Sequence, residues 1–356
     1  MPKTKVSYPW ENNYTVDLLK RFIFTRYFSW RKFYNLMLGL AQNFLLLDRA
    51  LARPVKMIIE PSDRCNLNCP LCPTGRRLAG RKETNLRLET FKKAVDPLAP
   101  YLYETYLYNW GEPLLNPELF NLVKYCSHRR IRTVVSTNLT LFESRMMNSL
   151  MDSGLDTMIV SLDGASAGSY SQYRRGGDFE KVIANLKAIA AEKTRRGAKY
   201  PRLVWQFIVF RHNETEIPQA IAMAKQMGID EIKFIASFAK METLAYNAAD
   251  KKQEELEDYL PQDHRYHLYN SNKGASRKVA QCPFLWNQIA VRTDGGIAPC
   301  CGSYHKDDDF GSLSDSDIMA VWNNEKYQQA RKTLRTRGWF KSHTICDQCI
   351  INDPYK

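Results

Sequence analysis

Short apolar or β-branched runs alternate with amphipathic stretches between Pro54 and about Phe238. Six of the runs are bounded by turn residues and predict strands over 55–60, 104–108, 133–136, 157–161, 203–210 and 231–235. The periodicity between them predicts helices over 88–95, 117–128, 143–153, 179–195 and 217–227. Alternating strands and helices form parallel sheets with right-handed crossovers. The pattern therefore predicts an α/β fold, wound as a barrel, a partial barrel or a doubly wound sheet.

Three other segments flank this alternating region. Residues 1–53 are basic and aromatic, 239–280 are polar and predict a connector, and 281–356 contain five cysteines in short elements, which predicts a second, small domain. Between Lys20 and Lys32, lysines and arginines are interleaved with phenylalanine, tyrosine and tryptophan. A basic amphipathic helix of this kind either packs on the next domain, which we favour, or lies in a membrane interface.

Composition and charge are those of an ordinary globular protein. The 356 residues are 44% apolar and 25% charged, which argues against disorder and allows about two domains. A net charge of +13 suggests a polyanionic partner: a nucleic acid, an anionic membrane surface or a phosphorylated substrate. No signal-peptide pattern opens the chain, and the uncharged stretch 33–47 is shorter than the ~20 residues of a membrane-spanning helix. We expect a cytoplasmic protein, with membrane association left open.

Three cysteines lie on one loop directly after the first predicted strand. Cys65, Cys69 and Cys72 are spaced C-x3-C-x2-C. Iron–sulfur cubanes are normally held by four thiolates, so three leave one iron open to a substrate or cofactor. Structural zinc usually takes four closed ligands in two separated pairs, and fits this triad less well. An odd total of nine cysteines without a secretion signal also argues against a disulfide framework.

A triad of this spacing after the first strand resembles the radical S-adenosylmethionine (radical SAM) superfamily. The resemblance covers about residues 54–238 and implies a partial (β/α)6 TIM-like barrel. It implies a [4Fe–4S] cluster on the three cysteines, whose open iron chelates S-adenosylmethionine (SAM). One electron, from a donor such as a flavodoxin or ferredoxin, then cleaves SAM to methionine and a 5′-deoxyadenosyl radical, which abstracts a substrate hydrogen atom.

Other positions match this family in chain order. Gly111 and Glu112 follow the second strand and resemble the motif that meets the SAM ammonium, although Trp110 replaces the first glycine of that motif. A carboxylate facing an ammonium is chemically sensible. By the same resemblance, the remaining SAM contacts fall on later strands and beside the third cysteine: Ser136 and Asn138 for the ribose, Gln206 for the carboxylate, Leu71 for the adenine, and Ser161 and Asp163 as further polar groups. No residue is identified as the catalytic acid or base.

A second set of cysteines lies near the C-terminus: Cys282, Cys300, Cys346 and Cys349. Four thiolates close a site, so spacing alone leaves zinc and iron–sulfur even, with His343 as a substitute ligand. The layout resembles the SPASM/twitch extension. A full SPASM domain carries seven cysteines and two clusters, and none follows Cys349 here, so one auxiliary [4Fe–4S] cluster is implied. Cys301 is an alternative to Cys300, whereas Cys126, on an apolar helical stretch, is expected to be a buried small hydrophobe.

A closed four-thiolate cluster has no free iron for substrate and is suited to electron transfer. The leading hypothesis is a radical SAM oxidoreductase, similar to a dehydrogenase, that passes an electron to this cluster. Its substrate would be a sugar, an aminocyclitol or other small molecule, a peptide, or a lipid-linked species. A radical SAM epimerase, methyltransferase or peptide-modifying enzyme would share every motif. A zinc- and nucleic-acid-binding protein would explain the charge but not the triad, and we rank it low.

Overall fold

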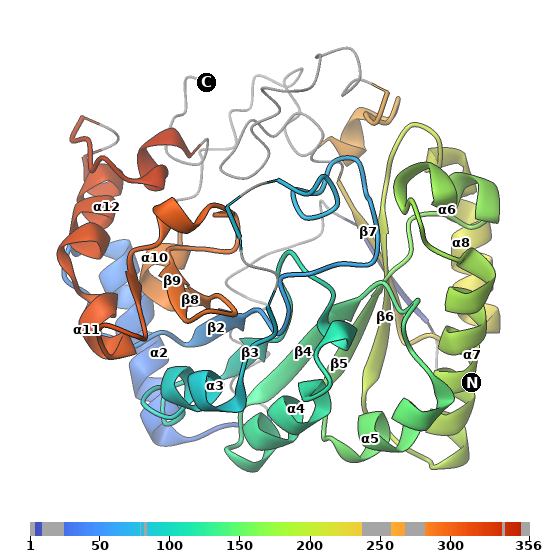
Figure 1. The fold of residues 1–356 in the computed structure, drawn as a ribbon, viewed down its shortest axis with the longest axis horizontal. Coiled ribbons are helices and arrows are strands. Elements are labelled where there is room, and N and C mark those ends of the chain that lie inside the picture. The colour runs from blue at the N-terminus through green and yellow to red at the C-terminus, as the bar shows by residue number, and fades with distance from the viewer. Residues whose placement is uncertain are drawn as a thin grey trace.

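The computed structural model describes residues 4–8, 25–78, 80–81, 84–236, 258–267, 282–336 and 339–349. Its strands form one ten-stranded sheet in the order β1-β7-β6-β5-β4-β3-β2-β8-β9-β10 (Figure 1). Neighbours from β2 to β7 pair in parallel and follow one another along the chain. This is the topology of an open, partial (β/α)6 barrel, so the α/β fold predicted from the sequence is confirmed.

The strands are β1 (Lys5–Ser7), β2 (Lys56–Ile59), β3 (Glu104–Tyr106), β4 (Arg132–Thr137), β5 (Thr157–Ser161), β6 (Arg202–Ile208), β7 (Glu231–Ile235), β8 (Gln288–Val291), β9 (Gly296–Ala298) and β10 (Gly311–Ser312). The helices are α2 (Trp30–Phe44), α3 (Leu88–Val95), α4 (Leu119–His128), α5 (Met147–Asp152), α6 (Ala167–Tyr173), α7 (Phe179–Arg195), α8 (Ile217–Gln226), α10 (Phe284–Asn287), α11 (Ile318–Trp322) and α12 (Glu325–Arg335). No helix of the described residues is long and apolar enough to span a membrane.

Each predicted strand exists, and its ends differ from the expected ones by at most two residues. The helix predicted over 143–153 is in fact a 3-10 turn, Ser144–Met146, followed by α5. The short helix α6 was not predicted, because its sequence is rich in serine and lacks an apolar period. Ser166 caps α6 by accepting a hydrogen bond from the Ser169 backbone N–H. The predicted connector 239–280 lies mostly outside the described residues.

The main hydrophobic core lies between the sheet and the helices that cover its outer face (Figure 1). Strand β6 shows the alternation: Leu203, Trp205 and Phe207 are fully buried in this core, whereas Val204 and Gln206 point to the opposite, inner face. A closed barrel packs that inner face with branched apolar side chains. The open sheet of this protein instead leaves room for polar ones.

Charged and hydroxyl side chains run across the inner face of the sheet. Arg132 pairs with Glu104 and donates a hydrogen bond to the Thr157 hydroxyl at 2.7 Å. On the neighbouring strands Arg202 pairs with Glu231 at 2.9 Å. These side chains are the first residues of their strands, so this layer of mutually paired polar groups lies at the amino ends of the sheet.

The C-terminal region continues the sheet of the barrel. β8 pairs in parallel with β2 over Lys56–Ile59, and β9 and β10 then add in antiparallel fashion. The fully buried guanidinium of Arg331 on α12 fixes this region to the rest by hydrogen bonds to the backbone oxygens of Asp48, Leu285 and Trp322. The residues after Cys282 are therefore built onto the edge of the barrel.

Candidate functional site

The loop after β2 brings the three cysteines of the first set together. Cys69 is buried and Cys65 and Cys72 are half-buried, and the Cys72 N–H donates to the Cys69 carbonyl at 3.1 Å. A Cβ on Gly75 would lie 2.6 Å from the backbone nitrogen of Cys69, so only glycine fits where the loop folds back on itself. The shape of the cysteine loop therefore depends on Gly75 as well as on the three cysteines.

The three thiols are neighbours in a dry environment. Burial raises the pKa of Cys65 to about 12 and that of Cys69 to about 11, and Cys65 also senses the charge of both other thiols. The guanidinium of Arg174 lies 3.9 Å from the Cys69 sulfur. Three thiols without other ligand types suit an iron–sulfur cluster, and the adjacent cation balances the negative charge of such a cluster. Binding of the cluster would release the thiol protons. Within the described ranges, no three His, Cys, Asp or Glu side chains are arranged around a single metal ion.

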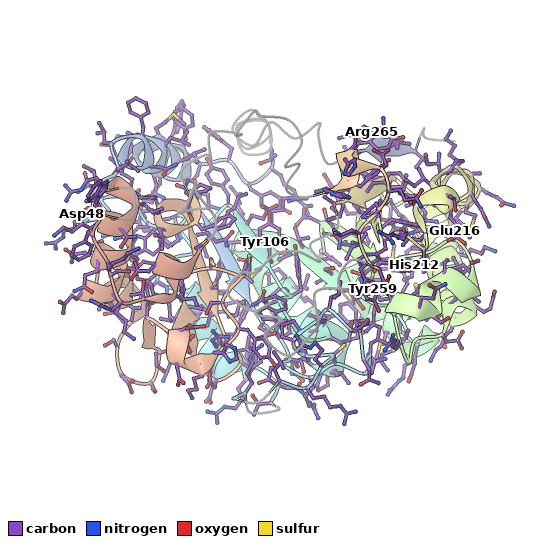
Figure 2. The ribbon with its side chains drawn as sticks, turned by 90° about the horizontal axis from the view of Figure 1, so that it is seen from above. Asp48, Tyr106, His212, Glu216, Tyr259 and Arg265 are labelled. Atoms are coloured by element: carbon purple, nitrogen blue, oxygen red, sulfur yellow. The ribbon has the colours of Figure 1, made fainter. Side chains whose placement is uncertain are left out.

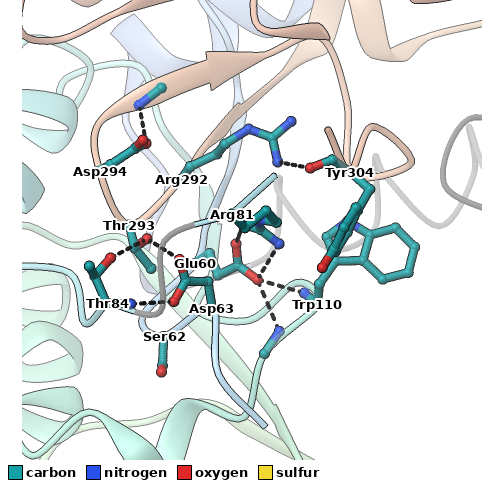
Figure 3. Close-up of polar contacts among 12 residues, drawn as sticks. Glu60, Ser62, Asp63, Arg81, Thr84, Trp110, Arg292, Thr293, Asp294 and Tyr304 are labelled. Carbon is teal, nitrogen blue, oxygen red and sulfur yellow. Dashed lines mark hydrogen bonds and ion pairs between the residues drawn. The ribbon is translucent and has the colours of Figure 1, made fainter. Parts of the chain in front are cut away.

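Glu60, at the carboxyl end of β2, holds the segment that contains the predicted glycine motif (Figure 3). One carboxylate oxygen accepts hydrogen bonds from the backbone N–H groups of Trp110 and Gly111, both at 2.9 Å, and the other oxygen pairs with Arg81. A Cβ at Gly111 would lie 1.9 Å from the Ser62 carbonyl oxygen. The backbone of this segment thus packs directly against the cysteine loop.

Glu112 is buried between the second and third loops. Its carboxylate accepts hydrogen bonds from the Thr137 hydroxyl at 2.6 Å and from the Asn138 N–H at 2.8 Å. Asn138 in turn donates to Asn66 on the cysteine loop at 3.0 Å. The structure therefore brings Glu112 and Asn138 to the triad, as expected, but engages both in contacts within the protein.

The other predicted SAM residues also lie at this end of the sheet. Asp163 is buried and pairs with Arg174, with 2.6 Å between the carboxylate and the guanidinium. The hydroxyls of Ser136 and Ser161 face each other at 3.4 Å, and half-buried Gln206 pairs with Ser161 in the strand register. Arg174 was missed in the sequence because it follows the unpredicted helix α6.

An aromatic wall stands beside the triad. Leu71 is buried in a small apolar cluster with Cys69, Tyr173 and Phe210, whose rings are 4.5 Å apart between centroids. His212 stacks on Phe210 at 5.5 Å and lies near Tyr259, as Figure 2 shows. Leu71 was expected to cover the adenine of SAM, but the sequence did not reveal the aromatic residues beside it, because they come from three separate segments.

The second cysteine set is also assembled. The thiols of Cys282, Cys300, Cys346 and Cys349 lie within electrostatic reach of one another, and burial raises the pKa of Cys282, Cys300 and Cys346. The Cys301 side chain packs instead against the apolar cluster of Ile58, Ala290 and Ala298. The alternative left open in the sequence, Cys300 or Cys301, therefore has a geometric answer that favours Cys300. Cys126 is fully buried in the main core, as expected.

Direct contacts join the segments around the two cysteine sets. The Trp110 indole N–H donates to the Ser303 carbonyl at 3.3 Å, and the Tyr304 hydroxyl donates to the Leu78 carbonyl at 3.3 Å. The Trp110 and Tyr304 rings meet edge to face, with centroids 5.9 Å apart. A further hydrogen bond, drawn in Figure 3, runs from the Thr293 hydroxyl to the Asp63 carboxylate at 3.0 Å.

Comparison with known proteins agrees with this arrangement. A family model for the radical SAM superfamily matches residues 59–224, and a second, the SPASM iron–sulfur cluster-binding domain, matches residues 282–350. AdoMet-dependent heme synthase of Methanosarcina barkeri is 28% identical over 165 residues, which are 46% of this chain and 45% of that protein, so the chain matches less than half of it. PqqA peptide cyclase of Gluconobacter oxydans is 24% identical over 76% of each chain.

Among solved structures, SuiB of Streptococcus suis bound to S-adenosylmethionine superimposes with a TM-score of 0.57. The match has 16% sequence identity and covers 84% of this chain and 70% of SuiB. SuiB has also been solved with its precursor peptide SuiA. At this identity the likeness shows a common fold.

Proposed function

Because the chain belongs to the radical SAM superfamily and carries a C-terminal SPASM domain, with [4Fe–4S] clusters and SAM as cofactors, we propose that it is a two-electron oxidoreductase. The observation that carries this proposal is the second cysteine set. In this proposal Cys282, Cys300, Cys346 and Cys349, whose thiols lie near one another, would hold one cluster with all four ligands, which would close it against substrate and leave electron transfer as its role.

The proposed reaction balances as an oxidation. When bound, SAM and the first cluster supply a 5′-deoxyadenosyl radical that removes one hydrogen atom from a substrate carbon. Loss of one further electron to the auxiliary cluster and of one proton to solvent completes a two-electron oxidation. In this scheme Cys65, Cys69 and Cys72 hold the first cluster, and Arg174 balances the charge beside Cys69.

Glu60 and Glu112 organise the SAM site in this proposal. Glu60 fixes the Trp110–Gly111 backbone through two hydrogen bonds, so that the peptide groups of this segment are preset for the SAM amino acid group. Glu112 bridges the third loop and lies close enough to Cys65 to influence its pKa. Ser136, Ser161 and Gln206 supply hydroxyl and amide groups on the inner face for the ribose and carboxylate of SAM.

The polar inner face of the sheet supports a small, hydroxyl-rich substrate such as a sugar or aminocyclitol. At the carboxyl ends of the strands, the hydroxyls of Ser136 and Ser161 and the amide of Gln206 present donors and acceptors rather than apolar surface. A peptide substrate is the second candidate, since a PqqA peptide cyclase and the peptide-bound SuiB are among the similar proteins. A flavodoxin or ferredoxin would act as the electron donor.

The test separates SAM cleavage from oxidation. We expect anaerobically reconstituted wild type to form 5′-deoxyadenosine with dithionite and to convert a member of an aminocyclitol and sugar panel into a product lighter by two hydrogens. Cys346→Ala should keep 5′-deoxyadenosine formation but lose this product, whereas Cys126→Ala serves as the matched control. Retention of oxidised product by Cys346→Ala, or an epimerised or methylated product from wild type, would overturn the oxidoreductase proposal.

A further inference from the structure

Helix α2 exposes a stripe of apolar side chains and buries several polar ones. Four large apolar side chains along it or at its end are exposed, with Trp30 at 77%, Tyr34 at 72%, Phe44 at 81% and Leu45 at 61%. They recur at helical spacing and share one face with half-buried Met37 and Leu38 and exposed Ala41. A surface helix normally turns such a stripe toward the core. A contiguous exposed apolar stripe of this kind is typical of an interaction surface.

The buried face of α2 combines Leu36, which packs with Val55 and Tyr103, with polar side chains that are hydrogen bonded. Gln42 donates to the Trp286 carbonyl at 3.1 Å and accepts from the N–H groups of Leu51 and Ala52. Asn35 exchanges two hydrogen bonds with the backbone of Arg53, at 2.8 and 2.9 Å. These bonds fix the rotation of the helix, so the apolar face cannot turn inward without leaving buried polar groups unpaired.

A basic pocket of about 430 Å³ lies at the N-terminal end of the same helix. Four of its nine lining residues are cationic and none is acidic: Tyr27, Phe28, Ser29, Arg31, Lys32, Ala99, Pro100, Arg129 and Arg130. Asp96, outside the lining, pairs with Arg129 at 3.0 Å. Phe28 joins the pocket to the apolar face, since its ring lies 5.3 Å from that of Trp30.

One wall of the pocket is the ammonium group of Lys32, and the pocket has no acidic lining residue to balance its charge. Lys32 is buried and its ammonium donates to the Arg130 carbonyl at 2.6 Å. Burial and the adjacent positive charge of Arg130 lower the pKa of Lys32 to about 8. An anion in this pocket would compensate both charges.

We propose that the apolar face of α2 and the basic pocket form a docking surface for an anionic lipid bilayer. Trp30, Tyr34 and Phe44 would enter the interfacial layer, where aromatic side chains of this kind concentrate, and the pocket would take a lipid phosphate. The chain's charge of +13 complements an anionic membrane, whereas a second copy would bring the same positive charge against it.

The surface lies away from the catalytic end of the barrel. Its pocket includes the loops that precede β3 and β4, at the amino ends of the strands, whereas the cysteine triad follows the carboxyl end of β2. Docking through α2 would therefore leave the substrate side open, and the proposal does not depend on the oxidoreductase activity.

Vesicle co-sedimentation of the full chain tests the proposal. We expect wild type to bind vesicles in which phosphatidylglycerol makes up about a third of the lipid, to bind pure phosphatidylcholine weakly, and to lose affinity in high salt. Arg31→Glu with Arg130→Glu should weaken binding by at least about 25-fold, at about fivefold for each arginine. Trp30→Gln, Tyr34→Gln and Phe44→Gln combined should abolish it.

Two matched controls carry the same changes elsewhere. Lys181→Glu with Lys187→Glu reverses two exposed charges on α7, and Trp339→Gln removes a tryptophan that is 93% exposed. Both should sediment like wild type, and all variants should cleave SAM normally. Equal loss of binding in the controls, or no binding by wild type, would overturn the proposal. So would a lipid-free dimer that the triple glutamine variant converts to monomer, since the face would then join two copies.

Discussion

At the scale of single residues, Glu60 is the side chain with the widest reach in the site. It is 1% exposed, accepts two backbone hydrogen bonds from the Trp110–Gly111 segment, and pairs with Arg81, whose guanidinium lies over the Tyr304 ring at 5.0 Å. One carboxylate thereby joins the cysteine loop, the glycine segment and the C-terminal region. Glu60 is not part of the C-x3-C-x2-C motif, so the sequence pattern did not identify it.

We predict that Glu60→Gln lowers the free energy of unfolding by about 3 kcal/mol, because the buried guanidinium of Arg81 loses its counter-charge. SAM binding should weaken as well, since the amide supplies one acceptor oxygen instead of two. Urea unfolding and SAM titration measure the two effects. The matched control is Glu143→Gln, whose exposed pair with Arg145 contributes at most about 1 kcal/mol. Equal effects of the two substitutions would contradict this role for Glu60.

Sequence patterns identified residues whose chemistry is carried by type and spacing. The triad and the C-terminal C-x2-C pair were identified because cysteines at such short spacing usually bind a metal or an iron–sulfur cluster. Arg174 and Glu60 were not, because an arginine or glutamate acquires its role only from what folds against it. Glu112 and Asp163 were identified, but their bonds to Thr137 and Arg174 were not foreseeable from one chain.

At the scale of elements, the periodicity of apolar residues predicted those helices and strands whose buried and exposed positions alternate regularly. β5, β7, α3 and α7 begin and end at the expected residues, since each alternates cleanly between core and solvent or inner face. The basic, aromatic segment between Lys20 and Lys32 was expected to pack on the next domain or lie in a membrane interface, and its residues 20–24 lie outside the described residues. The pattern did not reveal which face of α2 is buried. Its orientation is set by Gln42 and Asn35, whose backbone partners are brought near only by the tertiary fold.

The loop after β9 gives the sharpest prediction at this scale. The Cys300 thiol lies near Cys282 and Cys346, whereas the Cys301 side chain packs against the apolar cluster of Ile58, Ala290 and Ala298. Cys300→Ser should therefore reduce the iron content of reconstituted protein from about eight to about four per chain, and Cys301→Ser should leave it near eight. Iron and sulfide assays measure this. The reverse pattern would assign the auxiliary site to Cys301.

At the scale of the whole molecule, the two cysteine sets lie on separate parts of one continuous sheet. The first set follows β2, and in the second set Cys282 precedes β8 and Cys300 follows β9. Contacts such as those of Trp110 with Ser303 and of Thr293 with Asp63 hold the two parts together. Each set nevertheless draws its thiols from its own segment, so each cluster should assemble without the other.

We predict that the combined variant Cys65→Ala, Cys69→Ala and Cys72→Ala folds and retains about four irons per chain. The remaining cluster should give an EPR signal on reduction, and SAM should no longer alter that signal, because no iron is left open. Cys126→Ala controls for the loss of a buried thiol. Complete loss of iron in well-folded protein would show that the auxiliary site depends on the first cluster.

The pairing of β8 with β2 also has a consequence for synthesis of the chain. β2 is the second strand to leave the ribosome, yet its outer neighbour β8 follows more than 200 residues later. At roughly 5–20 residues per second, one edge of the nascent barrel stays unpaired for at least about 10 s. An open strand edge invites pairing with other chains. Chaperone binding over that interval should therefore raise the yield of correctly folded protein, whereas slower translation of the segment between β2 and β8 should lower it.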